Sequence, residues 1–184
     1  MAKSESGTGR RIGIRAQRTL FMGAFDLTNR HCVVVGGGMV ALRKLNKLLD
    51  AGADVTVVSP EVVEPMIELE KMGRVKWRDR PYQDGDLSGA WMVVAATNCR
   101  DVNQRVAEEA ERLRVWCNVA DDGASTPWAM PAIVRRGGIL IALSSGGHHP
   151  GVAKALREEL ESDLQSGSNQ FIRHLQSFEW NEEE

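Results

Sequence analysis

The feature that most constrains this chain is a glycine turn between an apolar run and an amphipathic segment. The stretch HCVVVGGGMVALRK leads from β-branched residues through three glycines into a helical pattern. Gly36 permits a tight turn, Gly38 lets the backbone approach a phosphate, and Ala41 allows close packing of helix and strand. Free N–H groups and the helix dipole then favour a pyrophosphate, which predicts dinucleotide binding, whereas the alternative is a turn that only connects strand to helix. The predicted cofactor-binding residues here are Gly36, Gly38, Met39, Val40 and Ala41.

Short β-branched runs alternate with helical segments after this turn, which is typical of βαβ units and a parallel sheet covered on both faces. The pattern predicts an α/β fold, a Rossmann-type doubly wound parallel sheet. The predicted strands are 32–35, 55–58, 75–77, 92–95, 115–118 and 139–143, and the predicted helices are 40–49, 61–72, 101–112 and 152–164.

Changes in composition and hydrophobic periodicity along the sequence divide the chain into four parts. Residues 1–20 form a polar arm with scattered arginines, and residues 21–130 hold the dinucleotide-binding domain. A glycine-rich turn, a strand and a charged helix fill residues 131–165, and residues 166–184 carry one short amphipathic helix through Phe171, Leu175 and Phe178 before an acidic tail.

Composition excludes several classes of protein. A net charge of −2 and a pI near 6.1 give no reason to expect a nucleic-acid or membrane partner. Cys32, Cys99 and Cys117 lie far apart and suggest neither a disulfide framework nor a zinc site. No signal peptide or membrane span is present in the sequence, so we expect a cytoplasmic protein.

Polar residues at the ends of two further predicted strands are candidate cofactor ligands. Ser59 stands where an NAD-binding unit commonly has Asp or Glu for the ribose hydroxyls, and it would offer a weaker hydrogen bond. Arg43 and Lys44 are the nearest cations for a 2′-phosphate, so the sequence favours NAD over NADP without settling the choice. Thr97 and Asn98 follow the 92–95 strand at the ligand-binding edge, although Asn98 alone is equally explained by turn chemistry.

More specific motifs follow along the chain: FDLTNRHCVVVGGGMVALRK, VVAATNCRDVNQRV, CNVADD and MPAIVRRGGILIALSSGGHHPGVAKALREELE. Together they resemble the precorrin-2 dehydrogenase family, the dehydrogenase module of siroheme synthase, over residues 22 to 165. The resemblance implies NAD-dependent oxidation of the tetrapyrrole precorrin-2 to sirohydrochlorin. It also implies a homodimer in which the segment 131–143 builds the dimer and part of the active-site cleft.

The resemblance further assigns individual residues. Asp121 matches the family's catalytic aspartate, and a carboxylate at the end of a parallel strand suits a base that takes a proton as hydride leaves. Asp122 departs from the commoner single aspartate, and a helix or turn cap is the alternative for either residue. The predicted substrate-binding residues are Ser145, Gly146, Gly147, His148, Arg135 and Arg136, with Lys154 and Arg157 nearby as either anion ligands or a solvated face. We expect no metal ligation by His148 and His149.

Two alternative functions remain open. Some family members also insert ferrous iron into sirohydrochlorin, but the short segment after Leu164 favours a dehydrogenase alone. A non-catalytic dinucleotide-sensing module is the other alternative, and it would need no reactive carboxylate at Asp121. The sequence does not decide the role of residues 1–20 or whether separate enzymes supply methyltransferase and chelatase steps.

Overall fold

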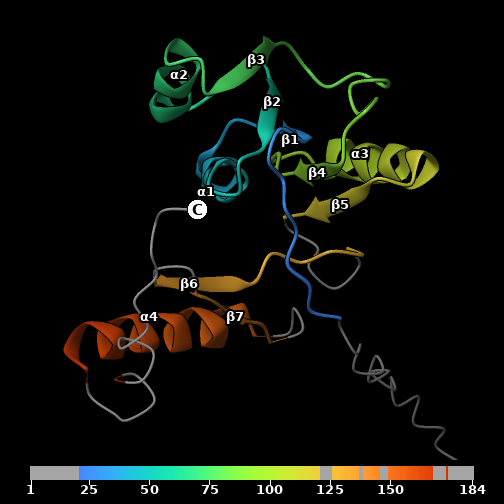
Figure 1. Ribbon diagram of the computed structural model, residues 1–184. Helices are drawn as coiled ribbons and strands as arrows, with labels where there is room; N and C mark the ends of the chain where they lie inside the picture. The colour runs from blue at the N-terminus through green and yellow to red at the C-terminus, as the bar shows by residue number, and fades with distance from the viewer. Residues whose placement is uncertain (1–20, 121–125, 137–138, 146–148, 168–172, 174–184) are drawn as a thin grey trace, which may run out of the picture.

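A five-stranded parallel sheet forms the centre of the protein. The computed structural model describes residues 21–120, 126–136, 139–145, 149–167 and 173. The strands are β1 (His31–Val35), β2 (Asp54–Ser59), β3 (Val75–Asp79), β4 (Met92–Ala95) and β5 (Trp116–Val119), in the order β3-β2-β1-β4-β5. The chain order reverses between β1 and β4, so their carboxyl ends mark the topological switch point where α/β sheets bind ligands. The predicted doubly wound sheet is confirmed (Figure 1).

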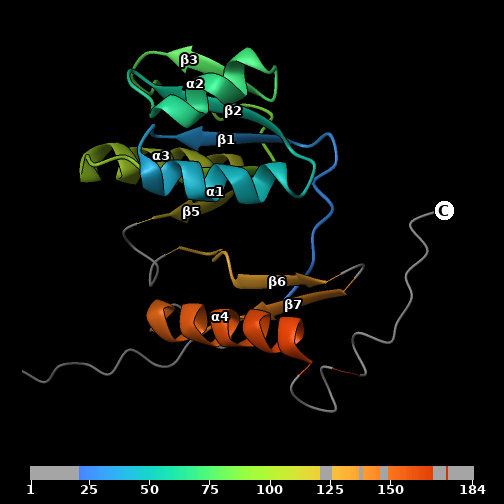
Figure 2. The same ribbon diagram turned by 90° about the vertical axis from the view of Figure 1, so that its left-hand side faces the viewer.

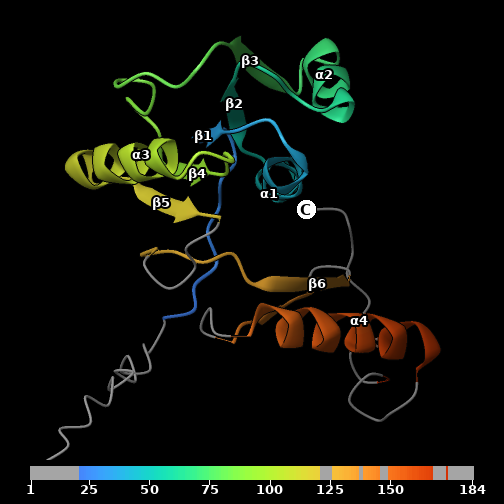
Figure 3. The ribbon, with the colours of Figure 1, turned by 180° about the vertical axis from the view of Figure 1, so that it is seen from behind.

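Helices cover both faces of this sheet because alternate strand residues are apolar on each side. On one face α1 (Met39–Leu49) packs on β1, β2 and β4 and α2 (Glu64–Lys71) packs on β3, with Leu45 and Met66 buried. On the other face α3 (Arg100–Leu113) buries Val106 and Ala110 against β4 and β5. Figure 3 shows the two helical layers from behind, on opposite sides of the strands.

A smaller unit follows the sheet. Strands β6 (Ala132–Arg136) and β7 (Ile139–Leu143) pair antiparallel, and α4 (Pro150–Ser166) lies along them. Figure 2 shows this unit as a separate layer beneath β5 and α1. Its own core is small: among the described residues of this unit Val134, Ala153 and Leu164 are the buried apolar side chains, and Ile141 and Leu160 pack against Val134 and Leu164.

One predicted boundary was wrong and one strand was missed. Helix α2 begins at Glu64 rather than at residue 61, because the Val63 N–H donates to the Gly37 carbonyl at 2.9 Å and Pro65 stands in the first turn. Strand β6 was not predicted, because it has only three consecutive apolar residues before Arg135 and Arg136 and therefore a short β-pattern. The predicted helix through Phe171, Leu175 and Phe178 lies outside the described residues.

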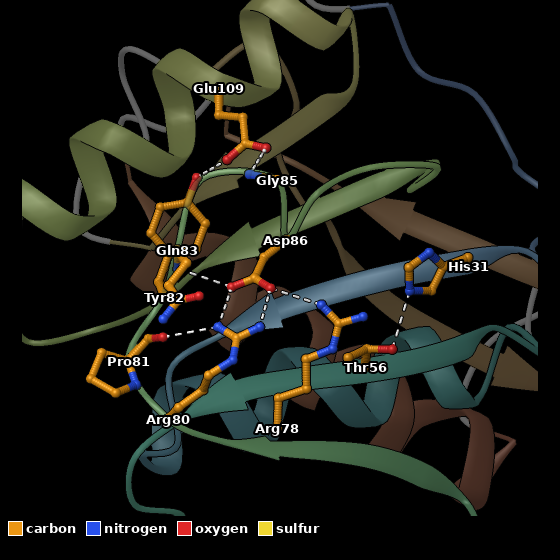
Figure 4. Close-up of polar contacts among 10 residues, drawn as sticks. All are labelled: His31, Thr56, Arg78, Arg80, Pro81, Tyr82, Gln83, Gly85, Asp86 and Glu109. Carbon is orange, nitrogen blue, oxygen red and sulfur yellow. Dashed lines mark hydrogen bonds and ion pairs between the residues drawn. The ribbon is translucent and has the colours of Figure 1, made fainter.

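The segment between β3 and β4 is fixed by two buried carboxylates (Figure 4). Asp86 accepts hydrogen bonds from Arg80 at 2.6 and 2.8 Å, from Arg78 at 2.8 Å and from the Gln83 N–H at 2.9 Å. Glu109 of α3 accepts from the Tyr82 hydroxyl and, at 2.8 Å, from the Gly85 N–H. The connection from β3 to β4 contains no α-helix, and these hydrogen bonds hold it against the sheet.

Asp86 is expected to contribute to stability through its ionised form. Hydrogen bonding to Arg80 lowers its pKa from 3.8 to about 2, and the side chain is 4% exposed. We expect Asp86→Asn to lower the free energy of unfolding by about 2 kcal/mol at pH 7. The difference should shrink as the pH falls below 3.8 towards 2, because the protonated wild type loses the same interactions. Urea denaturation at pH 7 and pH 3 measures it.

Asp84→Asn is the matched control for this prediction. Asp84 pairs with Arg105 at 2.9 Å, but its side chain is 61% exposed, so the change should cost less than about 0.5 kcal/mol. Equal losses for the two variants, or a loss in Asp86→Asn that does not depend on pH, would contradict the assignment.

Candidate functional site

A groove of about 750 Å³ opens at the carboxyl edge of the parallel sheet. The ends of β1, β2 and β4, the glycine turn and the start of α1 form it, and the segment after β3 contributes one wall. Seven of the eight predicted cofactor residues line it; the exception is Ala41, which is fully buried in the core and serves the helix–strand packing predicted for it. The groove is lined in part by Gly36, Gly38, Met39, Val40, Ser59, Thr97, Asn98, Glu61, Pro81 and Tyr82.

Each of the three glycines of the turn is required for a different structural reason. Gly36 has φ +123°, and a Cβ there would lie 2.4 Å from the Ala96 carbonyl oxygen. A Cβ on Gly37 would lie 1.8 Å from the Glu61 carbonyl oxygen, so this position is as demanding as the two predicted ones. A Cβ on Gly38 would meet nothing within 4 Å. The backbone at Gly38 is therefore bare towards the groove, as close approach of a ligand requires.

The N-terminus of α1 faces this open space without a side-chain cap. Gly38 is the N-cap residue, no side chain accepts from the first turn, and the first turn carries no acidic residue. The Gly38 carbonyl accepts from the Leu42 N–H at 3.0 Å, so the helix begins directly at the turn. Such an end presents N–H groups and a positive dipole to an anion.

Ser59 is in the groove but its hydroxyl already has a partner. The Ser59 Oγ donates to the Glu61 carbonyl at 2.6 Å, and the Ser59 carbonyl accepts from the Trp77 indole N–H at 2.9 Å. Ribose binding by Ser59 stays a prediction. Neither Arg43 nor Lys44 lines this groove, and the arginines near the end of β3, Arg78 and Arg80, are paired with Asp86.

Thr97 is held by a residue that the sequence did not single out. Buried Asn103 accepts from the Thr97 N–H at 3.0 Å and from the Thr97 hydroxyl at 2.7 Å, and its amide donates to the Thr97 carbonyl at 3.0 Å. Asn98, one residue further along, is exposed. Asn103 thus fixes the β4–α3 turn, and the available signal was an amide on the otherwise apolar face of the predicted helix.

Basic residues gather at a second groove, of about 560 Å³, between α1, β6 and α4. Arg135, Lys154 and Arg157 line it as the predicted positive field, together with Lys47, which the sequence analysis did not include. Lys154 and Arg157 also pair with Glu158, and Arg157 pairs with Glu161, so part of this charge is neutralised.

The remaining predicted substrate residues are only partly described. Arg136 is exposed on β6 and does not line the second groove, and Ser145 accepts a hydrogen bond from the His149 N–H at 3.1 Å. Asp121, Gly146, Gly147 and His148 lie outside the described residues. Among the described residues, no three His, Cys, Asp or Glu side chains gather as metal ligands, and no helix has the length and apolarity to cross a membrane.

Two lysines of α1 reach other parts of the fold, Lys44 to β5 of the same sheet and Lys47 to the chain that enters the second unit. The Lys44 ammonium donates to the Asn118 Oδ1 at 2.6 Å, and the Lys47 ammonium donates to the Pro131 carbonyl at 2.9 Å. Burial lowers the pKa of Lys44 to about 8, with Lys47 and Arg43 adding to the effect, and it also lowers the pKa of Lys47.

Comparisons with known proteins agree with this geometry. Residues 24–132 match the family described as putative NAD(P)-binding. The chain is 44% identical to siroheme synthase 3 of Aeromonas hydrophila over 138 residues and 44% identical to siroheme synthase of Nitrosospira multiformis over 141 residues. Those alignments cover 75% and 74% of this chain but 30% of each relative, so the chain spans about a third of their length.

A solved structure is similar over most of the fold. SirC, described as a precorrin-2 dehydrogenase, superposes with a TM-score of 0.69 at 28% identity, covering 85% of this chain and 76% of SirC. The match to the NAD(P)-binding family covers more than half of the chain and includes the glycine turn and the groove. The chain therefore belongs to this NAD(P)-binding family and, within it, to the precorrin-2 dehydrogenase family that its motifs resemble.

Proposed function

We propose that this protein oxidises precorrin-2 to sirohydrochlorin with NAD as the hydride acceptor, as a step of siroheme biosynthesis. The observation that carries the proposal is the groove at the switch point, where the bare Gly38 backbone meets the uncapped start of α1 in a chain similar to SirC. A sensing module would share the groove but would have no need for a base.

The residues of the first groove fit a dinucleotide. The glycine turn and the first turn of α1 would hold the pyrophosphate, since they offer backbone N–H groups and the open space above Gly38. Thr97 and Asn98 would border the part of the cofactor that lies over the end of β4. When bound, NAD accepts a hydride from the substrate. Arg78 and Arg80 both already donate to Asp86, whose carboxylate balances one of their two charges, and this engagement supports NAD over NADP.

Asp121 is proposed as the catalytic base. Oxidation removes two hydrogens from the macrocycle, one as hydride to NAD and one as a proton, and a carboxylate near the switch point is suited to accept that proton. Ala120, the residue before Asp121 in the sequence, donates its N–H to the Ala95 carbonyl at 2.8 Å, at the carboxyl end of β4.

The basic residues of the second unit are proposed to bind substrate carboxylates. Precorrin-2 carries many carboxylates, and the groove lined by Lys47, Arg135 and Arg157 has an excess of positive side chains. Arg136 and the Ser145 to His148 turn are proposed to extend this contact.

We further propose that the protein is a cytoplasmic homodimer with no nucleic-acid or membrane partner. A two-stranded sheet under one helix is marginal by itself, and the core around Val134 and Leu164 is small. Leu140 of β7 and Val152 and Leu156 of α4 are each about half exposed. A second copy that covered these apolar residues would complete the core.

Turnover tests the proposed base directly. We expect the purified protein to convert precorrin-2 anaerobically with NAD, and Asp121→Ala to lower kcat by about 100-fold or more because the proton acceptor is lost. Asp122→Ala is the matched control and should retain activity. NADH and sirohydrochlorin absorbance report the reaction, and ferrous iron added afterwards tests the chelatase alternative. Tight NAD binding without turnover would favour the sensing module instead.

A pair of glycine variants separates nucleotide binding from folding. Gly38→Ser should weaken NAD binding by about ten-fold, because its side chain enters the space of the pyrophosphate, yet leave stability unchanged. Gly37→Ala should lower the free energy of unfolding by about 1–3 kcal/mol, because the new Cβ meets the Glu61 carbonyl. Calorimetric NAD titration and urea denaturation measure both. Unchanged NAD affinity in Gly38→Ser would place the cofactor elsewhere.

An apolar-to-charged change tests the dimer. We expect Leu156→Glu to shift the molar mass in solution from twice 20.3 kDa towards 20.3 kDa, because a carboxylate would be buried at the proposed interface. Met72→Glu, at an exposed position by α2, is the control and should leave the mass unchanged. Light scattering after gel filtration gives the masses, and a dimer that persists in Leu156→Glu would move the interface away from α4.

A further inference from the structure

The dinucleotide groove contains one charged side chain, and it is acidic. Of the described residues that line this groove, Glu61 is the one whose side chain is charged at pH 7. Glu61 is exposed, and within the described part of the chain its carboxylate has no hydrogen-bond donor or cation as a partner. A carboxylate beside an anionic pyrophosphate is unfavourable through repulsion of like charges unless the ligand itself brings a donor. The groove therefore holds a charged acceptor that no described residue satisfies.

The backbone of Glu61 is fixed against the glycine turn. The Ser59 Oγ donates to the Glu61 carbonyl at 2.6 Å. A Cβ on Gly37 would lie 1.8 Å from the same carbonyl oxygen, and the Val63 N–H donates to the Gly37 carbonyl at 2.9 Å. Glu61 is thus held next to the turn that is proposed to bind the pyrophosphate. Both riboses of NAD are bonded to that pyrophosphate, so a ribose lies within reach of this carboxylate.

The place of Glu61 in the fold selects the adenosine ribose. Rossmann units use an acidic residue, about 20 residues after the glycines, to accept from the 2′-hydroxyl of that ribose. By spacing this residue is Ser59, but its hydroxyl proton already goes to the Glu61 carbonyl. Ser59 pairs with Asp79 at the ends of β2 and β3. Glu61 and Pro81 each stand two residues further on, and both line the groove. The acidic function is therefore moved from the end of β2 into the turn that follows it.

Apolar side chains on the same side of the groove suit the adenine ring. The residues after β2 and β3 that line the groove include Pro60, Val62, Pro81 and Tyr82. The ring of Tyr82 is fixed, because its hydroxyl donates to Glu109 of α3 (Figure 4). Ligand sites combine such apolar walls with a few placed polar groups that set orientation and specificity. An adenine against this wall would carry its ribose to Glu61.

We propose that Glu61 binds the 2′-hydroxyl of the adenosine ribose and makes the groove selective for NAD over NADP. The inference rests on the proposed function, because it takes the groove to be the dinucleotide site of that reaction. In NAD the hydroxyl donates to the carboxylate, which is a charge-assisted hydrogen bond. In NADP a phosphate replaces that hydroxyl and brings negative charge to the same place. None of the described lining residues supplies a cation to offset it.

Nucleotide titrations of the full chain without precorrin-2 test the assignment. We expect the wild type to bind NAD more tightly than NADP. Glu61→Gln, which keeps the size of the side chain but loses the charge, should weaken NAD binding by about three- to ten-fold and strengthen NADP binding. The preference for NAD should therefore fall by about ten-fold or more. Calorimetry gives both Kd values.

Glu64→Gln is the matched control for these titrations. Glu64 is exposed in the first turn of α2 and does not line the groove, so both Kd values should stay within about two-fold of the wild type. Urea denaturation of Glu61→Gln should match the wild type, since this exposed carboxylate has no described partner to lose. A change in Kd then reports a lost contact with the nucleotide.

Removal of the hydroxyl from the ligand identifies the contacting group. NAD that lacks the adenosine 2′-hydroxyl should bind the wild type about ten-fold more weakly than NAD does. Glu61→Ala should bind the two ligands within about two-fold of each other, because the partner of the hydroxyl is gone. An equal loss in both proteins would overturn the proposal, as would an unchanged preference for NAD in Glu61→Gln.

The same titrations separate this inference from the proposed function. Wild-type protein that binds NAD but does not oxidise precorrin-2 would refute the proposed function, and the Kd ratios would still decide the role of Glu61. Oxidation of precorrin-2 by the wild type, together with full NAD preference in Glu61→Gln, would refute the role of Glu61 alone. Absence of NAD binding by the wild type would overturn both.

Discussion

The close approach of backbone to backbone at the glycine turn is the constraint on which the site depends. Gly36 lies against the Ala96 carbonyl at the end of β4, and Gly37 lies against the Glu61 carbonyl after β2. The Gly36 N–H donates to the Val58 carbonyl, and the Gly37 carbonyl accepts from Val63. These contacts bring three strand ends together around the start of α1. A side chain at either position would push them apart and remove the groove.

Buried charges in this protein serve two different purposes. Asp86 accepts four hydrogen bonds and Glu109 accepts two, and together they fix the segment between β3 and β4, one wall of the groove, so their burial is explained by structure. Lys44 has a neutral amide partner and like charges nearby, and its burial is explained less well by stability. Perturbed ionisation marks functional sites only when structural pairing does not account for it.

The second unit depends on contacts with the rest of the molecule. Its core among the described residues is small, and Lys47 of α1 anchors the chain that enters it by donating to the Pro131 carbonyl. The basic groove lies where these parts meet, so substrate binding as proposed requires the sheet, α1 and α4 together.

The sequence by itself determined the parallel sheet, the order of its elements and the position of the dinucleotide groove, because periodicity and the glycine pattern are local properties of the chain. Six strands and four helices were placed from such patterns, with an error at the start of α2 and with β6 missed. The tertiary structure alone decided what depends on residues far apart in sequence. The demand for glycine at position 37 comes from Glu61, the role of Asn103 from Thr97, and the partner of Lys44 lies 74 residues away at Asn118. No local pattern encodes such contacts, because they exist only after the sheet has brought the strand ends and helices together.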